Sequence, residues 1–143
     1  MTVKAILSRK GNDVITIEPT VTLSAAVTML AEHRIGAIVV AGADKQVAGI
    51  LSERDIVRAL AQRGPGALQE AVGQVMTRKV VTCTESDTVA ALMERMTKGK
   101  FRHLPVVERG RLAGLVSIGD VVKYRLEEME HESNALREYI LTA

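Results

Sequence analysis

A seven-residue pattern occurs twice in this 143-residue chain, and its repetition constrains the fold more than any other feature. In each copy a glycine precedes two apolar residues and a serine, and an aspartate follows three residues after the serine. The copies are 49–55 (GILSERD) and 114–120 (GLVSIGD). The apolar residues are typical of a buried strand, and the serine and aspartate are typical of the first turn of a helix. The pattern therefore predicts a strand that leads directly into a capped helix, at two places.

The repetition extends upstream of this pattern. Corresponding residues are separated by 66 positions, as in Val14 and Val80, or Thr22 and Thr88. The second copy is one residue shorter at its hairpin, so that Ser52 corresponds to Ser117. A unit of this length is too long for a solenoid repeat. We therefore predict an α/β (α+β) fold with two β-α-β-β-α units related by a pseudo-twofold axis, followed by a long C-terminal helix.

Each unit shows the same order of expected elements. Short apolar runs predict strands at 14–17, 37–41, 47–51, 80–83, 104–107 and 112–116. Helices are expected to begin after the caps Thr22, Ser52 and Thr88, and near Ser117. Residues 3–7 are expected to form a short strand or a turn of helix. The connecting segment 67–77 is expected to be helical over about 68–75.

These elements divide the chain into a first unit at 1–66, a second unit at 67–123 and a helical extension at 124–143. The extension is one long helical pattern over 121–141 without Pro or Gly. Its apolar residues are Val122, Leu126, Met129, Leu136, Tyr139 and Ile140. Two arrangements remain open for this helix: it folds back on its own module, or it packs across a dimer.

Composition excludes several classes of function. The net charge is only +2 with acidic and basic residues interspersed, so nucleic-acid binding is not expected. Cys83 is the single cysteine, and His33 and His131 lack partners at ligand spacing, so neither a metal site nor catalysis is expected. The chain has no apolar run of membrane-spanning length and no signal pattern, which favours a cytoplasmic protein.

With the repeat in view, the chain resembles a tandem pair of CBS (cystathionine-β-synthase-type) domains, also called a Bateman module. The resemblance rests on the doubled pattern, on Phe101–Val107 (FRHLPVV) and on Val75–Thr77 (VMT), and it covers the chain up to about Lys123. It implies a non-catalytic regulatory module that binds AMP, ADP, ATP, NADH or S-adenosylmethionine between its two halves. It also implies a homodimer of such pairs. Members often accompany a catalytic or transport domain. This sequence shows no such domain, so it is expected to act as a stand-alone module.

The resemblance assigns Asp55 and Asp120 to the ribose hydroxyls of the ligand. Ser52 and Ser117 would hold its phosphate at the helix start, where free N–H groups favour an anion. The alternative for each Ser/Asp pair is ordinary helix capping. Asp120 is expected to contribute most to binding.

The two halves differ near these helices. Arg54 stands at the position of Gly119, and Arg102 and His103 align with Gly36 and Ala37. Arg102, with Lys100, is expected to hold phosphate, because a guanidinium binds phosphate oxygens in a fork. A nearby phosphate would raise the pKa of His103. The alternatives are solvated surface arginines and a packed histidine.

The adenine pocket is assigned by resemblance to Thr16 and Thr82 with their neighbours Ile17 and Cys83. Its wall would include the set Ile35, Gly36, Ala37, Leu104 and Pro105. The alternative is plain core packing, and Cys83 is most simply a small buried apolar residue. The predicted function is a homodimeric energy or redox sensor that responds to an adenine nucleotide, AMP first. The alternative is a structural or protein-interaction module with no physiological nucleotide.

Overall fold

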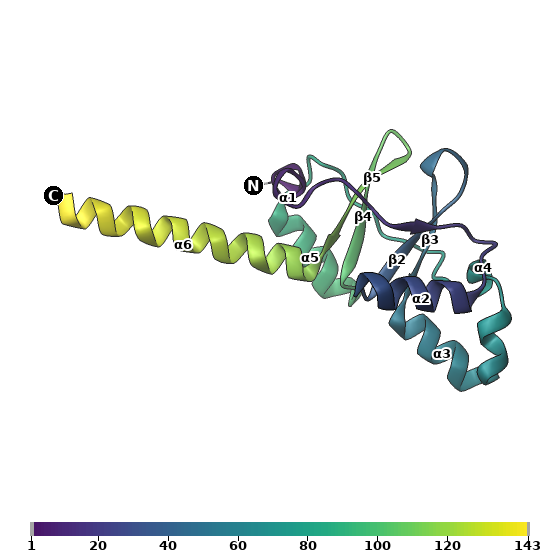
Figure 1. The fold of residues 1–143 in the computed structure, drawn as a ribbon. Coiled ribbons are helices and arrows are strands. Elements are labelled where there is room, and N and C mark those ends of the chain that lie inside the picture. The colour runs from purple at the N-terminus through teal and green to yellow at the C-terminus, as the bar shows by residue number, and fades with distance from the viewer. Residues whose placement is uncertain (1, 143) are drawn as a thin grey trace.

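The computed structural model describes residues 2–142 and contains the two predicted units side by side (Figure 1). The first unit consists of β1 (Thr16–Ile17), α2 (Leu23–His33), β2 (Ala37–Ala41), β3 (Val47–Ser52) and α3 (Glu53–Arg63). The second consists of α5 (Val89–Gly99), β4 (His103–Glu108), β5 (Arg111–Ser117) and α6 (Ile118–Thr142). The remaining elements are α1 (Val3–Lys10), η1 (Ala43–Lys45), η2 (Pro65–Gln69) and α4 (Val72–Val75). The predicted mixed fold is confirmed.

Equivalent helices begin and end in the same way. The Thr22 hydroxyl accepts a hydrogen bond from Ala25 N–H at 3.3 Å, and the Thr88 hydroxyl accepts one from Ala91 N–H at 3.1 Å. Both predicted caps are therefore confirmed. The residue after each helix, Lys100 in the second unit, has a positive φ near 56° that turns the chain into the next strand.

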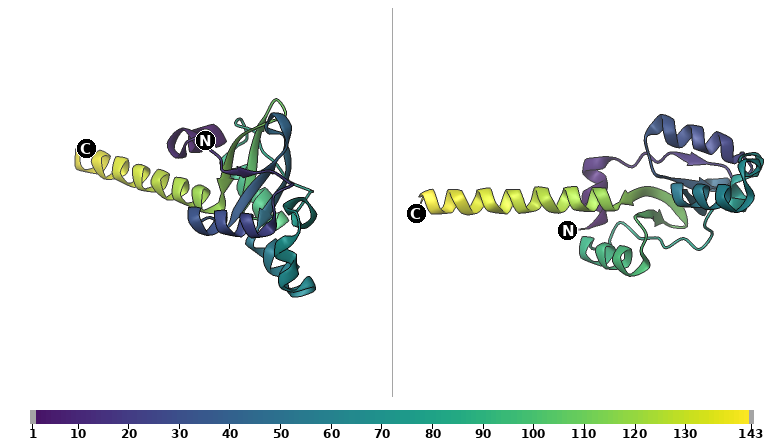
Figure 2. Two further views of the ribbon diagram at one scale, coloured as in Figure 1. Left: turned by 45° about the vertical axis from the view of Figure 1, so that its right-hand side comes forward. Right: turned by 90° about the horizontal axis from the view of Figure 1, so that it is seen from below.

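The two sheets also share their topology. In the first, β1 runs parallel to β2, with Ile17 opposite Val40, and β2 pairs antiparallel with β3. In the second, β4 pairs antiparallel with β5, and a parallel bridge joins Cys83 to Val106. Cys83 and Val106 lie 66 positions after Ile17 and Val40, so the bridge is the counterpart of the β1–β2 pairing. Figure 2 shows the two hairpins next to each other.

Two strand predictions need correction. The strand expected at 14–17 is reduced to Thr16–Ile17, and the strand expected at 80–83 is reduced to the bridge at Cys83. The reason is local: the Val80 N–H donates to the carbonyl of Arg78 at 3.0 Å instead of to a neighbouring strand. The helix expected over 68–75 is divided into η2 and α4, because Glu70 and Ala71 are extended.

The lead-in helices are exchanged between the units, an arrangement that no local sequence pattern predicts. Helix α1, expected to be a short strand or turn, is a full helix that packs against the second unit. The Val3 N–H donates to Asp87 O at 2.9 Å, and the Val72 N–H of α4 donates to Val21 O at 2.8 Å. Val3 and Val72 are both fully buried. Each unit therefore completes its core with the segment that precedes the other unit.

This exchange explains the two glycines that open the repeated pattern. A Cβ atom at Gly49 would lie 2.6 Å from the Thr77 carbonyl oxygen and 2.7 Å from Met76 Sδ. A Cβ atom at Gly114 would lie 2.8 Å from Leu7 Cδ2. In each unit the exchanged segment lies directly on the hairpin, so only glycine leaves enough room.

The apolar interior divides into one core for each unit. The first contains residues of α2, β2, β3 and α4, among them Leu23, Ile38 and Val72. The second contains residues of α1, α5, β4 and β5, among them Val3, Leu92 and Leu104. Burial of each such side chain contributes roughly 1.5–3 kcal/mol to the stability of the fold. The two cores therefore hold the helices and strands, and the side chains at their ends, in fixed positions.

Helix α6 has 25 residues and projects away from both units (Figure 1). Its first turns are held by α1, because Arg9 forms an ion pair with Glu127 and lies 5.1 Å from the ring centre of Tyr124. Every described residue from Met129 onward is exposed. The arrangement in which this helix folds back on its own module is therefore wrong, and packing across a dimer stays a prediction. The boundaries at 66/67 and 123/124 also stay predictions, and α6 is continuous across the second.

Candidate functional site

The first Ser/Asp pair forms a capping box at the start of α3. The Ser52 hydroxyl accepts a hydrogen bond from Asp55 N–H at 3.3 Å, and Asp55 Oδ2 accepts one from Ser52 N–H at 2.9 Å. The second pair repeats this geometry at α6. Asp120 N–H donates to the Ser117 hydroxyl at 3.1 Å, and Ser117 N–H donates to Asp120 Oδ2 at 2.9 Å. The capping alternative is confirmed for both pairs, and it leaves Oδ1 of each carboxylate for other partners.

The remaining partners of the two carboxylates differ. Asp55 Oδ1 accepts a hydrogen bond from the Thr77 hydroxyl at 3.1 Å, and Arg58 lies at 4.0 Å. Asp55 is only 7% exposed. At Asp120, the ammonium group of Lys10 lies 2.5 Å from Oδ2 and donates a second bond to the Leu115 carbonyl at 2.6 Å. Both carboxylates thus have a cation nearby, but Arg58 lies at 4.0 Å from Asp55 without a hydrogen bond, whereas Lys10 donates a hydrogen bond directly to Asp120.

A cavity of about 280 Å³ lies beside Asp55, between the two units. Eight of the predicted site residues line it: Gly36, Ala37, Ser52, Arg54, Asp55, Lys100, Arg102 and His103. The first five belong to the first unit and the last three to the second, so the cavity exists only because the units are packed together. The tertiary structure therefore brings together the first Ser/Asp pair and the cations of the second half.

Four cationic side chains at this cavity lack an acidic partner. They are Arg54, Lys79, Lys100 and Arg102. None of them forms an ion pair within the described range 2–142. The acidic residues of the same wall are Glu53 and Asp55. Because the cations outnumber the carboxylates beside the start of helix α3, the cavity suits an anion.

Sequence reasoning missed part of this wall. The cavity is also lined by seven residues that were not predicted: Ile50, Glu53, Thr77, Lys79, Val80, Val81 and Phe101. A signal for two of them was present, because Leu7–Lys10 (LSRK) and Met76–Lys79 (MTRK) are copies of one segment. This repeat identifies Thr77 and Lys79 as the counterparts of Ser8 and Lys10. The exchange of the lead-in segments then carries each copy to the Ser/Asp pair of the other unit.

Ten predicted residues lie outside this cavity. Ile17, Cys83, Leu104 and Pro105 are buried, Thr16 and Thr82 are exposed, and Ile35 packs beside the first core. The assigned adenine contacts of these residues stay predictions. Burial of Cys83 confirms that it is a small apolar core residue. Ser117, Gly119 and Asp120 belong to the start of α6.

Two titratable groups near the centre of the molecule have shifted pKa values. Burial lowers the pKa of His103, and Lys10 and Arg102 add to this effect, whereas Asp120 and Glu53 oppose it. Burial tends to raise the pKa of Asp120, but the hydrogen bond and charge of Lys10, with the Ser117 hydrogen bonds, bring it below its usual value. In the protein without ligand, His103 is therefore neutral at pH 7 and Asp120 is ionised.

The described residues contain no cluster of three or more His, Cys, Asp or Glu side chains that could hold a metal ion. Among the helices of residues 2–142, none is both long and apolar enough to span a bilayer.

Comparison with known proteins identifies the two units. The family model described as CBS domain matches residues 3–62 and 72–127. A CBS-domain containing protein from Agrobacterium tumefaciens is 52% identical, and its crystal structure superposes with a TM-score of 0.83 over 87% of this chain and 92% of that one.

Two further structures of similar proteins contain ligands. A CBS domain pair in complex with 5′-methylthioadenosine and S-adenosyl-L-methionine is 26% identical, with a TM-score of 0.79 over 90% of this chain and 98% of that one. A CBS domain protein from Pyrobaculum aerophilum complexed with AMP is 30% identical, with a TM-score of 0.74 over 84% and 89%.

Among curated proteins, a CBS domain-containing protein of Arabidopsis thaliana, described as mitochondrial, is 37% identical over 119 residues, which make up 80% of this chain. The chain spans only 58% of the length of that relative.

Proposed function

Because this chain belongs to the CBS-domain family, we propose that it is a regulatory module whose cavity beside Asp55 binds an adenosine nucleotide through its ribose and phosphate. One observation carries this proposal: a buried carboxylate and four cations that form no ion pair within residues 2–142 line the same cavity between the units. The adenosine ligands of two similar proteins support the class of ligand.

The chemistry of the wall suggests how the ligand is held. The carboxylate of Asp55 accepts hydrogen bonds from the ribose hydroxyls through Oδ1, the oxygen that Thr77 contacts in the free protein. Arg54, Lys79, Lys100 and Arg102 bind the phosphate. The aliphatic side chains of Ile50, Val80 and Val81 cover the base. With four cations present, AMP, ADP, ATP or NADH is favoured over S-adenosylmethionine, whose sulfonium group is itself positive.

The geometry also favours one ligand for each chain. Lys10 neutralises Asp120 and bonds to the Leu115 carbonyl, so the second Ser/Asp pair is already occupied by the protein itself. We therefore assign the main binding role to Asp55, not to Asp120, the residue expected from the sequence.

Isothermal titration of the full chain with AMP, ATP, NADH and S-adenosylmethionine tests the proposal. Asp55→Asn keeps an acceptor for the Ser52 N–H but removes the charge, and we expect it to weaken AMP binding by about 10- to 100-fold. Asp120→Asn is the matched control, with an expected change below about two-fold. The proposal fails if no adenosine ligand binds and none raises the melting temperature.

A second candidate is a structural or protein-interaction module, which the exposed apolar residues of α6 favour. If a regulated partner is captured equally by the native chain and by Asp55→Asn, with or without AMP, this candidate is preferred. A role as an energy sensor, the absence of catalysis and a cytoplasmic location all stay predictions for this chain.

A further inference from the structure

Helix α6 carries an exposed apolar stripe, whose first two residues, Val122 and Leu126, border an open hollow that Arg102 also lines. Six positions follow one another at alternating spacings of four and three residues. They are Val122, Leu126, Met129, Ser133, Leu136 and Ile140, and all but Ser133 are apolar. The five apolar side chains are 49–64% exposed. At 3.6 residues per turn the six positions fall within about 80° of the helix circumference. We call this set the α6 stripe.

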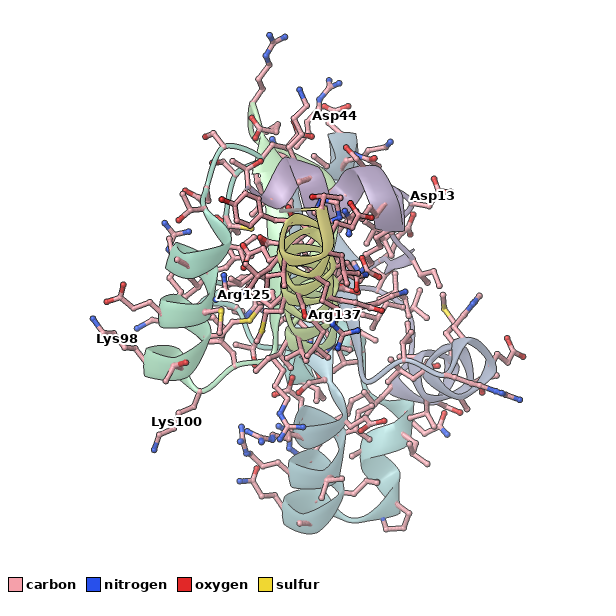
Figure 3. The ribbon with its side chains drawn as sticks, turned by 90° about the vertical axis from the view of Figure 1, so that its left-hand side faces the viewer. Asp13, Asp44, Lys98, Lys100, Arg125 and Arg137 are labelled. Carbon is pink, nitrogen blue, oxygen red and sulfur yellow. The ribbon has the colours of Figure 1, made fainter. Side chains whose placement is uncertain are left out.

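From Met129 onward the α6 stripe lies clear of the rest of the chain, because every described residue there is exposed. The side of α6 that contacts the module carries Val121, which is buried, and Tyr124 and Glu127, which meet Arg9 of α1. At 3.6 residues per turn, Tyr124 lies opposite Val122 and Leu126, whereas Val121 and Glu127 lie on the flanks of the helix. Figure 3 looks along α6 and labels Arg125 and Arg137, which flank the stripe on the side remote from α1.

The spacing of the stripe is that of a heptad repeat. Leu126, Ser133 and Ile140 take the a positions, and Val122, Met129 and Leu136 take the d positions. A stripe repeating every seven residues buries itself best against an identical stripe on a second helix, because both helices then bend around each other at the same pitch. A single serine at an a position favours alignment with its own copy, since a polar group there avoids an apolar neighbour.

The flanking charges select one orientation of the two helices. Arg125 and Glu132 occupy g positions, and Glu130 and Arg137 occupy e positions. In a parallel pair each g residue faces the e residue five positions later in the other helix. Arg125 then faces Glu130 of the second copy, and Glu132 faces Arg137 of the second copy. Both pairs have opposite charges, and within residues 2–142 none of the four side chains forms an ion pair.

From these relationships we propose that α6 forms a parallel, in-register two-stranded coiled coil with α6 of a second copy of this chain. The contact is made by the α6 stripe and bordered by four interchain ion pairs, two on each side of the helix pair. The proposal is independent of nucleotide binding, because it uses none of the residues that line the cavity beside Asp55.

Sedimentation equilibrium of the full chain over a concentration series tests the association. The native protein is expected to reach a dimer of twice 15.5 kDa. The double variant Leu126→Glu/Leu136→Glu is expected to raise the dimer dissociation constant by at least about 100-fold, since it removes four leucines from the contact. Its circular dichroism melt reports whether the two units remain folded. A native monomer, or a folded double variant that still dimerises, overturns the proposal.

Charge exchange tests the orientation. Glu132→Lys alone and Arg137→Glu alone each create like-charge pairs and are expected to weaken the dimer by about 10-fold. The combined variant restores opposite charges and should recover the native dissociation constant. Glu138→Lys makes the same charge change on the outer side of the helix and is the matched control, with no expected effect.

Mild oxidation of Leu126→Cys provides a second readout of orientation. Parallel helices place the two introduced thiols next to each other, so a disulfide-linked dimer is expected. Antiparallel helices that overlap along the stripe pair position 126 with position 136, which holds the two introduced thiols about 15 Å apart along the helix axis, too far for a disulfide. A stable dimer that does not cross-link, or failure of the combined charge variant to recover affinity, overturns the parallel arrangement.

Discussion

The ammonium group of Lys10 lies 2.5 Å from Oδ2 of Asp120, although 110 positions separate the two residues. The counterpart of Lys10 is Lys79, which lines the cavity beside Asp55 and forms no ion pair within residues 2–142. Two copies of one lysine thus have different positions relative to their aspartates. Three inserted residues, Gly11–Asp13, follow Lys10 but have no counterpart after Lys79. The two halves of the module are therefore chemically unequal, because only the second aspartate, Asp120, is paired with its lysine.

Removal of Lys10 should release Asp120. In Lys10→Met the pKa of Asp120 is expected to rise, because the hydrogen bond and the positive charge are lost while burial of the carboxyl group remains. Carboxyl-detected NMR of the free protein measures this pKa directly. Lys79→Met is the matched control and should leave it unchanged. An Asp120 pKa that does not move in Lys10→Met would show that the ion pair does not form in solution.

The same variant should change the number of ligands that bind. With Asp120 free, we expect isothermal titration with AMP to move from one site towards two sites for each chain. Asp55→Asn combined with Lys10→Met should then retain the weaker new site. A stoichiometry of two in the native protein would contradict the role assigned to Lys10.

Stability is expected to fall as the pH drops below about 6.5, the ordinary pKa of histidine. Burial lowers the pKa of His103 in the folded state, so the unfolded chain takes up its proton first. Stability is therefore fully present above the unfolded pKa and is lost as pH falls towards the folded value. Urea unfolding at pH 7.5 and 5.5 should show a smaller loss for His103→Gln than for the native chain. Equal losses would mean that His103 titrates normally.

Substitution of the two motif glycines should have unequal effects. Gly49→Ala places a Cβ against the backbone carbonyl of Thr77, which cannot move aside, and should destabilise the protein by about 2–3 kcal/mol. Gly114→Ala meets the side chain of Leu7, which can rotate, and should cost about 1–2 kcal/mol. Gly42→Ala enters open space and is the control. Thermal melts rank the three variants, and the reverse order of the first two would contradict the exchanged packing.

The thiol of Cys83 should be unreactive in the folded protein. Burial, with a smaller contribution from Asp87, raises its pKa to about 12, so almost no thiolate exists at pH 8. Iodoacetamide is expected to label Cys83 only after denaturation, as mass spectrometry of the intact protein would show. Rapid labelling of the native chain would indicate that the second core opens.

Local spacing was enough to predict the two hairpins and the four helices of the repeated units with their caps, but not α1 or the division of the helix expected over 68–75. Thr22, Ser52 and Thr88 lie next to the N–H groups that they cap, so their role is fixed within a few residues. The repeat predicted two units with one topology, because equivalent sequences form equivalent pairings. The strand at 80–83 failed as a prediction because strand propensity cannot show that the Val80 N–H bonds locally to Arg78, which leaves only Cys83 paired with β4.

The sequence by itself thus determined two similar units, their hairpins and main helices, and the two Ser/Asp capping pairs, all of which depend on residues close together in the chain. Only the tertiary structure decided that α1 and α4 exchange units, that the cations of one half gather around Asp55 of the other, and that Lys10 neutralises Asp120. These contacts join residues far apart in sequence. Their geometry follows from how two apolar cores pack together, and no local pattern encodes that packing.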